Sequence, residues 1–286
     1  MFNFLLQPFG LILQYIYKYL AFGNYGIAII IFTLFVKILL FPLTLKQQLS
    51  TIKTQALQPE LAALKKTYGK DNQALMQEQQ KLYTKYGVNP MAGCLPTLLM
   101  FPVIIVVYQI IRGPLTFISG LSSETLKGLS ELAKAGSIGT DELSMNSWLL
   151  SGSGVPDSAA QLLGNSPLVN MHFLGLDLGI VPTRAFSSSF WTYAPLLLIP
   201  VLVLVSQYIV QWYSSPTRGQ KKEKGQKDPT QRGMGLMMKI MPLMTFVIAL
   251  ITPAALGFYW LVSNLFTLLQ TFLINTFFIK KNEKEV

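Results

Sequence analysis

The residue with the clearest chemical meaning is Lys37, a charged side chain inside a long apolar run. It is the only charged residue between positions 26 and 45. A lysine near the middle of a bilayer costs roughly 2.5–3.5 kcal/mol on insertion scales, and its usual remedy is a carboxylate partner. The apolar runs of this chain contain no Asp or Glu. Lys37 is therefore predicted to face water, polar side chains or a ligand. The alternative is that it snorkels to the nearer membrane interface.

Polar residues in the other apolar runs could supply wet surroundings for this cation. Thr33 lies four residues before Lys37 and shares its helix face. Further polar groups are predicted to line the same cavity: Gln207 in the third run, and Trp260, Ser263 and Asn264 in the last. Such residues also hold membrane helices together. Together with an unpaired cation, they predict an inward cavity with positive potential.

The residues around this cavity do not predict chemistry at a covalent bond. The sequence shows no acid–base pair, nucleophile–base pair or phosphate-binding loop near them. One cysteine (Cys94) and one histidine (His172) provide too few soft ligands for a zinc or iron–sulfur site. We therefore expect no enzyme activity, no metal and no cofactor. A cationic cavity of this kind binds an anionic or dipolar molecule, or lets it pass.

Long apolar runs must position these residues. The chain has 286 residues, of which 51% are apolar and only 13% charged, whereas soluble domains carry about 25% charge. A membrane-spanning helix needs roughly 20 apolar residues, and Thr252–Pro253 breaks the longest run in two. The sequence predicts an all-α polytopic membrane protein with five transmembrane helices at 24–45, 91–112, 190–213, 236–252 and 254–279.

The N-terminal segment, residues 1–23, is apolar and aromatic with one charge, Lys18. It is predicted to form an interfacial amphipathic helix outside the membrane. A sixth, imperfect span is the alternative.

The charges between the runs predict the orientation. Residues 46–90 carry a net charge of +4, residues 113–184 carry −3, and residues 218–232 carry +4. The positive-inside rule places the segments 46–90, 214–235 and the tail 280–286 in the cytoplasm. The N-terminus and an extracytoplasmic loop at 113–189 then lie outside. Residues 46–90 are predicted to form a cytoplasmic helical hairpin, with Gly69 as the C-cap of its first helix and Asp71 or Asn72 as the N-cap of its second.

Three segments carry a family resemblance: FTLFVKILLFPLTLKQQLSTIKTQALQPEL, KYGVNPMAGCLPTLLMFPVIIVVYQII and GFYWLVSNLFTLLQ. They closely resemble the YidC, Oxa and Albino family of membrane protein insertases, in its bacterial five-span form. The resemblance implies five helices around a hydrophilic groove that opens to the cytoplasm and to lipid. By motif, the groove's basic residue falls on Lys37, where the family usually has arginine. Its threonine falls on Thr33, its aromatic residue on Trp260 and its glutamine on Gln207.

The resemblance implies a membrane protein insertase and chaperone in the bacterial plasma membrane, with the N-terminus outside and the C-terminus in the cytoplasm. It would move newly made membrane proteins into the bilayer without its own ATP hydrolysis and would work as a monomer. The ribosome and the Sec translocon are candidate partners, and no nucleic-acid contact is implied except on the ribosome. A small-solute transporter or channel is the alternative, although the chain shows no internal repeat. A membrane-bound enzyme is disfavoured because the spans lack carboxylates.

Overall fold

The computed structural model describes residues 3–69, 71–87, 105–152, 154–186, 190–214 and 229–279, and most of them are helical. The N-terminal half contains α1 (Asn3–Tyr15), η1 (Ile16–Leu20), α2 (Tyr25–Leu39), α3 (Phe41–Ala56), α4 (Gln58–Tyr68) and α5 (Asn72–Lys85). The middle contains a helical stretch at 105–112, α7 (Pro114–Phe117), α8 (Ser123–Ala135), α9 (Glu142–Ser151), α10 (Asp157–Leu163), β1 (His172–Phe173) and β2 (Leu176–Asp177). The C-terminal half contains η3 (Pro182–Phe186), α11 (Phe190–Tyr193), η4 (Ala194–Leu197), α12 (Leu198–Tyr213), α13 (Pro229–Ile251), α14 (Ala254–Ile274) and η5 (Asn275–Ile279).

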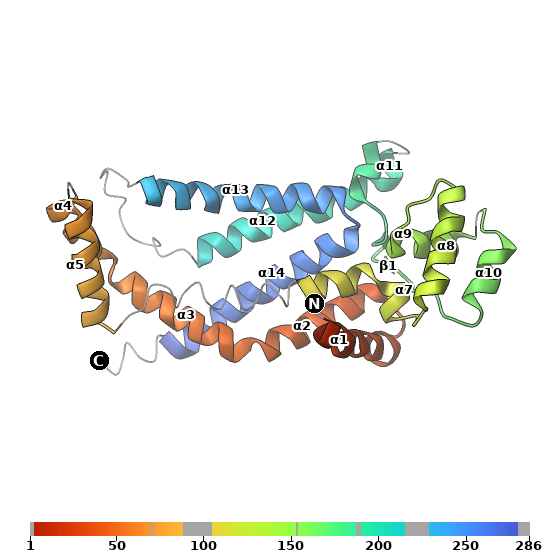
Figure 1. Ribbon diagram of the computed structural model, residues 1–286, viewed down its shortest axis with the longest axis horizontal. Coiled ribbons are helices and arrows are strands. Elements are labelled where there is room, and N and C mark those ends of the chain that lie inside the picture. The colour runs from red at the N-terminus through yellow and green to blue at the C-terminus, as the bar shows by residue number, and fades with distance from the viewer. Residues whose placement is uncertain are drawn as a thin grey trace.

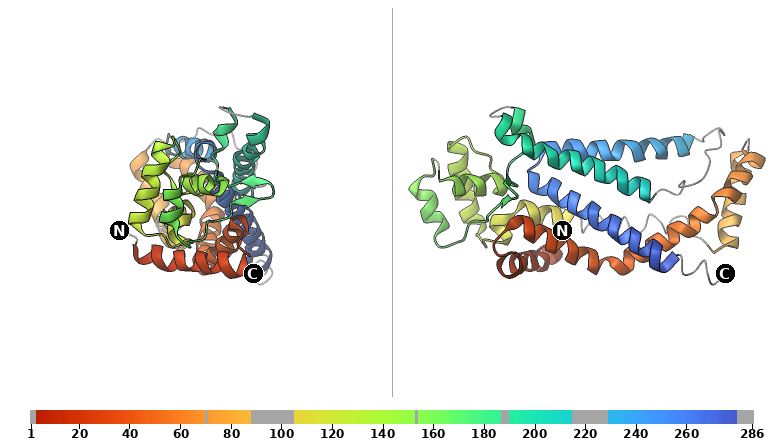
Figure 2. Two further views of the ribbon diagram at one scale, coloured as in Figure 1. Left: turned by 90° about the vertical axis from the view of Figure 1, so that its right-hand side faces the viewer. Right: turned by 180° about the vertical axis from the view of Figure 1, so that it is seen from behind.

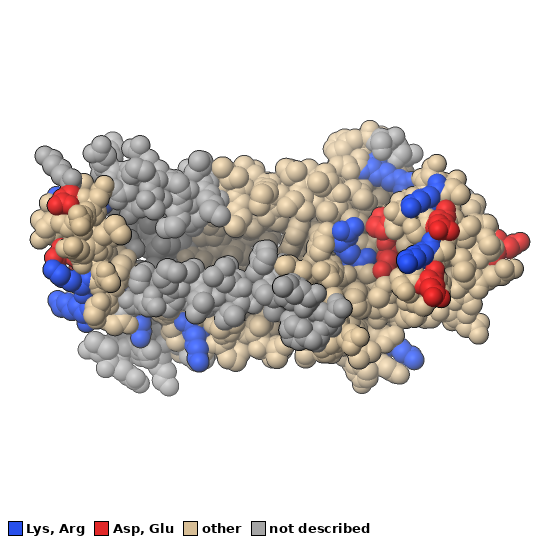
Figure 3. Space-filling model, in the orientation of Figure 1, with Lys and Arg blue, Asp and Glu red and all other residues tan. Residues whose placement is uncertain are grey.

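The molecule is elongated, and its long helices run along the long axis (Figure 1). Helices α4 and α5 lie at one end, and α8 and α10 lie at the other. Figure 2 shows the same arrangement end-on and from behind. On the face drawn in Figure 3, the charged side chains of the described residues gather mainly toward the two ends. Between the two ends, the described residues on that face are largely uncharged.

The main core lies between the long helices. It buries one face of each of α2, α12 and α14, represented by Phe32, Val203 and Leu256, together with Ile110 of the stretch 105–112. The opposite helix faces are apolar and exposed, and they carry Leu34, Ile38, Leu39, Val201, Leu202, Val205, Leu265 and Leu269. Exposed apolar faces of this extent are expected where lipid replaces water. The chain is therefore a helical membrane protein, and β1–β2 is the one short hairpin of strands among the described residues.

Two described helices are long and apolar enough to cross a membrane, Phe190–Tyr213 and Ala254–Phe277. The pair α2 and α3 makes a third if the two count as one span bent by 59°, and Ile240–Ile251 is a shorter apolar helix. Helices α13 and α14 meet at Thr252–Pro253, where the sequence predicts a break. Of the predicted span 91–112, residues 91–104 lie outside the described residues, as do most of 214–235 and all of 280–286. The count of five spans stays a prediction.

The first predicted span, 24–45, is not one straight helix. Helix α2 ends at Leu39 and α3 begins at Phe41. Pro42 provides the reason, because proline lacks a backbone N–H and restricts the residue before it. The break places Lys37 in the last turn of α2.

The predicted hairpin at 46–90 contains α4 and α5, preceded by α3. Gly69 caps the end of α4, and the Asp71 carboxylate accepts hydrogen bonds from the backbone N–H groups of Gln73 and Ala74, both at 3.0 Å. The Tyr86 hydroxyl donates to the Glu60 carboxylate at 2.7 Å and links the two helices. Residues 88–90 lie outside the described residues.

The segment 113–189, predicted only as an extracytoplasmic loop, is folded over most of its length. Helices α7 to α10 enclose a second core that includes Leu129, Met145 and Trp148. Asn146 is fully buried and joins α9 to the chain near Val169: its Nδ2 donates to the Val169 carbonyl at 2.8 Å, and its Oδ1 accepts from the Val169 N–H at 2.9 Å. The Gly- and Ser-rich composition concealed these helices. Their capping residues Ser122 and Asp141 were the available signal.

Candidate functional site

The Lys37 ammonium points into the interface between α2 and α14. Its Nζ donates a hydrogen bond to Thr267 Oγ1 at 2.8 Å, and the Thr267 hydroxyl donates to the backbone carbonyl of Ser263 at 2.8 Å. The side chain is half-buried. Its place in the last turn of α2 brings the cation near the negative end of the helix dipole. The contact is a hydroxyl rather than a carboxylate, so the positive charge of Lys37 is not neutralised by it.

Two further hydrogen bonds extend this contact along α3 and α14. Gln270 donates to the hydroxyl of Thr44, and Gln48 Nε2 donates to Thr271 Oγ1 at 2.8 Å. We call the three pairs Lys37–Thr267, Thr44–Gln270 and Gln48–Thr271 the polar seam. Gln48 Oε1 is buried and has no hydrogen-bond partner within the described part of the chain. Hydrophilic groups therefore run from Lys37 toward the α4–α5 end of the molecule.

A separate polar contact joins α12 to α14. Asn264 Nδ2 donates to Ser206 Oγ at 3.0 Å, and Ser206 Oγ donates to the Val203 carbonyl at 3.0 Å. The neighbouring Gln207 has a buried Oε1 with no partner among the residues that the structure describes. Helix α14 thus presents polar groups to both α2 and α12.

The predicted site residues differ in how they are used. Thr33 is 1% exposed, and its hydroxyl donates to the Ile29 carbonyl at 2.6 Å, so this donor is satisfied within α2. Trp260 is half-buried and packs against the main core. Lys37 and Ser263 are joined through Thr267, and Asn264 is joined to α12. The structure gives Thr33 and Trp260 a packing role beside these contacts.

Sequence reasoning missed Thr267, Gln270 and Thr271. The signal was present, because Thr267 follows Ser263 by four residues and Asn264 by three, and Thr271 follows Thr267 by four. This spacing keeps them on one face of a helix. Extending the polar face of the last span by two turns would have found them.

The α2–α14 geometry is fixed at the end nearer the second core. The backbone N–H of Tyr25 donates to the Asn170 carbonyl at 3.0 Å. The N–H groups of Ala254 and Ala255 donate to the carbonyls of Ile180 and Leu178 at 2.9 and 2.7 Å. Segment 170–180 therefore ties the first residues of α2 and α14 together, which supports the alignment of Lys37 with Thr267.

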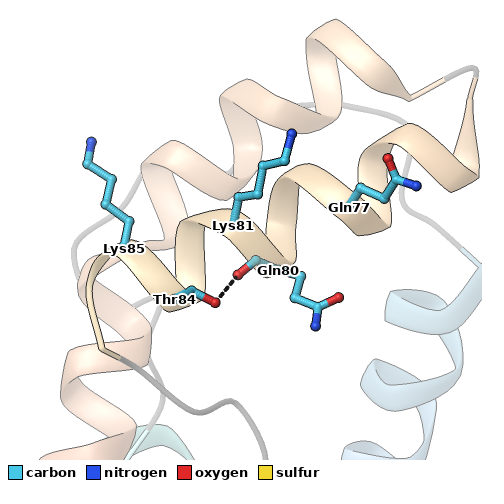
Figure 4. Close-up of a pocket in the computed structure, with 5 residues that line it drawn as sticks. All are labelled: Gln77, Gln80, Lys81, Thr84 and Lys85. Atoms are coloured by element: carbon cyan, nitrogen blue, oxygen red, sulfur yellow. Dashed lines mark hydrogen bonds between the residues drawn. The ribbon is translucent and has the colours of Figure 1, made fainter.

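The hairpin carries a second polar surface, far from Lys37. A shallow pocket on α5 is lined by Gln77, Gln80, Lys81, Thr84 and Lys85. In Figure 4, Lys81 and Lys85 project to the same side of the helix, while Gln80 points to the other. Lys81 also bonds Glu78 at 2.7 Å, and this bond raises the pKa of the lysine. The surface is basic and polar and is suited to an acidic or polar partner.

The described residues contain no group of three or more His, Cys, Asp or Glu that could hold a metal ion. The arrangement around Lys37 combines one cation with hydroxyl and amide groups. Such a set of groups is chemically suited to anionic or dipolar partners.

The sequence of the chain is similar to those of known proteins. A model of the 60Kd inner membrane protein family matches residues 16–282. The chain is similar to the membrane protein insertase MisCA of Bacillus subtilis, with 30% identity over 98% of this chain and 81% of that protein. It is similar to the membrane protein insertase YidC 2 of Bacillus anthracis, with 30% identity over 88% of this chain and 72% of that protein. It is also similar to the chloroplast inner membrane protein PPF-1 of Pisum sativum, with 33% identity over 86% of this chain and 48% of that protein. The chain thus spans about half the length of this chloroplast relative.

Proposed function

We propose that this chain, which belongs to the 60Kd inner membrane protein family, inserts newly made membrane proteins into the lipid bilayer. It acts as a chaperone for these substrates and takes them from the cytoplasm through a hydrophilic groove. Relatives in this family are named membrane protein insertases.

The observation that carries the proposal is the position of Lys37. Its ammonium lies between membrane helices, bonds a hydroxyl at 2.8 Å and faces spans without carboxylates. A charge in this position retains attraction for a carboxylate or a peptide dipole that passes it. In this proposal Gln207, Ser263 and Asn264 line the groove beside Lys37, and Thr33 and Trp260 support its wall.

The energy for insertion comes from the substrate. An apolar segment gains free energy on entering lipid, while a polar tail resists the crossing. A hydrated groove shortens the path of the tail through hydrocarbon, and the Lys37 cation lowers the cost of moving a carboxylate. The process therefore needs no ATP hydrolysis by the insertase.

The proposed arrangement has five spans, with the N-terminus outside and the C-terminus in the cytoplasm of a bacterial plasma membrane. The second core, α7 to α10, then lies outside, and the α4–α5 hairpin stands in the cytoplasm. The hairpin receives substrate, and the ribosome and the Sec translocon are its candidate partners. One copy of the chain carries the complete groove and works as a monomer.

Reconstitution in liposomes tests this function. A single-span substrate with an acidic outer tail is added, and protection of the tail from external protease is scored. Lys37→Arg should retain insertion because it keeps the cation, whereas Lys37→Glu should abolish it. Equal activity of the two variants would contradict the proposal. Passage of small solutes through the same vesicles, without tail protection, would instead identify a transporter or channel.

A further inference from the structure

Bulky apolar side chains are highly exposed near the points where the membrane-capable helices begin. The exposed fractions are 89% for Phe22, 85% for Leu174, 69% for Phe186 and 87% for Trp191. We call these four residues the apolar rim. Phe22, Leu174 and Trp191 are the three most exposed of the large apolar side chains among the described residues.

Two rim residues also have a costly backbone conformation. Phe22 and Leu174 both have φ of 51°, in the left-handed region, and each precedes a glycine with positive φ. Leu174 and Gly175 form the two-residue turn between β1 and β2, where Asn followed by Gly is the preferred pair. A leucine there disfavours the turn, and its exposed side chain returns no packing energy to the fold. A contact outside the chain would account for a leucine at this position.

The rim lies where the membrane-capable helices begin. Phe22 is three residues before α2, and Trp191 is the second residue of the span Phe190–Tyr213. The β1–β2 hairpin is tied to the same place because Asn24 Nδ2 donates to the His172 carbonyl at 2.9 Å. In Figure 1, α1, β1 and α11 lie at a similar level along the long axis. The rim therefore sits at the depth expected for one membrane interface.

Basic and aromatic groups accompany the rim. Lys18 Nζ lies 5.4 Å from the ring centre of Tyr19, and Arg184 Cζ lies 5.7 Å from that of Tyr193. Aromatic rings are enriched at the headgroup level of membranes, and basic side chains snorkel to the same level. We infer that the apolar rim inserts into the interfacial layer of the lipid leaflet at the level where the membrane-capable helices begin.

This anchor would set the depth of the functional site. Segment 170–180 bonds the first residues of both α2 and α14. Lys37 lies twelve residues after Tyr25 in α2, which is about 18 Å along the helix. Because α2 is a continuous helix, the depth of the rim in the bilayer sets the depth of Lys37. The inference concerns membrane contact and holds whether or not the chain inserts other proteins.

Depth-dependent quenching tests the contact. The probe is an environment-sensitive fluorophore on Leu174→Cys in a Cys94→Ser background, in liposomes containing lipids brominated near the headgroup. The matched control carries the same fluorophore on Lys134→Cys, an exposed position of α8. We expect several-fold stronger quenching and bluer emission at 174 than at 134. Equal, water-like emission at both positions would overturn the inference. A blue shift at 174 that grows with the protein-to-lipid ratio would also overturn it, because it would indicate contact with a second copy of the chain.

A second comparison separates lipid contact from turn formation. The fluorophore is placed on Leu20→Cys, and residue 174 is changed to Phe or to Asn. If the side chain anchors the hairpin in lipid, Leu174→Phe keeps the quenching at position 20, and Leu174→Asn reduces it several-fold. If the side chain serves only the turn, Asn retains the signal and Phe loses it, which would contradict the inference. Equal quenching in both variants would also contradict it.

Discussion

Replacing Thr267 by valine should uncouple Lys37 from α14. Valine has nearly the shape of threonine but lacks the hydroxyl that accepts the Lys37 hydrogen bond at 2.8 Å. Hydrogen bonds to charged groups contribute about 1.5–3 kcal/mol to stability, and leaving the charged donor without its partner carries a desolvation cost. Thr267→Val should therefore lower the free energy of unfolding by about 1.5–3 kcal/mol. The lost bond from Thr267 to Ser263 adds little, because it lies within one helix.

A double-mutant cycle isolates the interaction. Unfolding in mixed detergent micelles is measured for the unmodified protein, Thr267→Val, Lys37→Met and the double variant. Once Lys37 is methionine, Thr267→Val should have almost no effect, which gives a coupling energy of about 1.5–3 kcal/mol. Thr267→Ser is the matched control and should retain most of the coupling. Additive effects of the two substitutions would refute the contact, because the ammonium would then lie elsewhere.

Other substitutions and conditions test the rest of the structure. Asn146→Ala should destabilise the second core by at least about 2 kcal/mol in urea unfolding, because it leaves the buried N–H and carbonyl of Val169 without partners; an unchanged midpoint would contradict this. Burial raises the pKa of Glu142, although the N–H and hydroxyl of Thr116 donate to it and lower the pKa by a smaller amount. Between the usual pKa of a glutamate and the raised pKa of Glu142, the native state binds more protons than the unfolded state. The free energy of unfolding should therefore fall as the pH rises between these two values. Glu142→Gln should remove this pH dependence. Hydrogen exchange should be faster in α4 and α5 than in α2, because the hairpin buries few apolar side chains; deep protection across 58–85 would oppose this.

Local signals in the sequence predicted several helix ends. Asp71 and Gly69 were readable as caps, and Pro253 as a helix break, because capping and proline geometry depend only on neighbouring residues. Pro42 carried the same kind of information about the end of α2. The apolar run continues past Pro42, however, and hydropathy alone does not register a bend.

Contacts between distant helices were harder to predict. The unpaired charge of Lys37 was evident from the sequence, but its partner Thr267 is 230 residues away. A helical period identifies which residues share a face, and it does not identify the neighbouring helix. The fold of 113–189 was missed for a related reason: its second core forms only when α7 to α10 meet, and the composition between the helices resembles a loop.

The measurement closest to the central claim compares two tails in reconstituted liposomes. One single-span substrate carries aspartates in its outer tail, and a matched substrate carries asparagines at the same positions. The unmodified protein should protect a larger fraction of the aspartate tails than of the asparagine tails. In Lys37→Met this difference should disappear. In vesicles without the protein, both tails should be equally sensitive to protease. An aspartate preference that persists in Lys37→Met would show that the ammonium of Lys37 does not attract the passing chain.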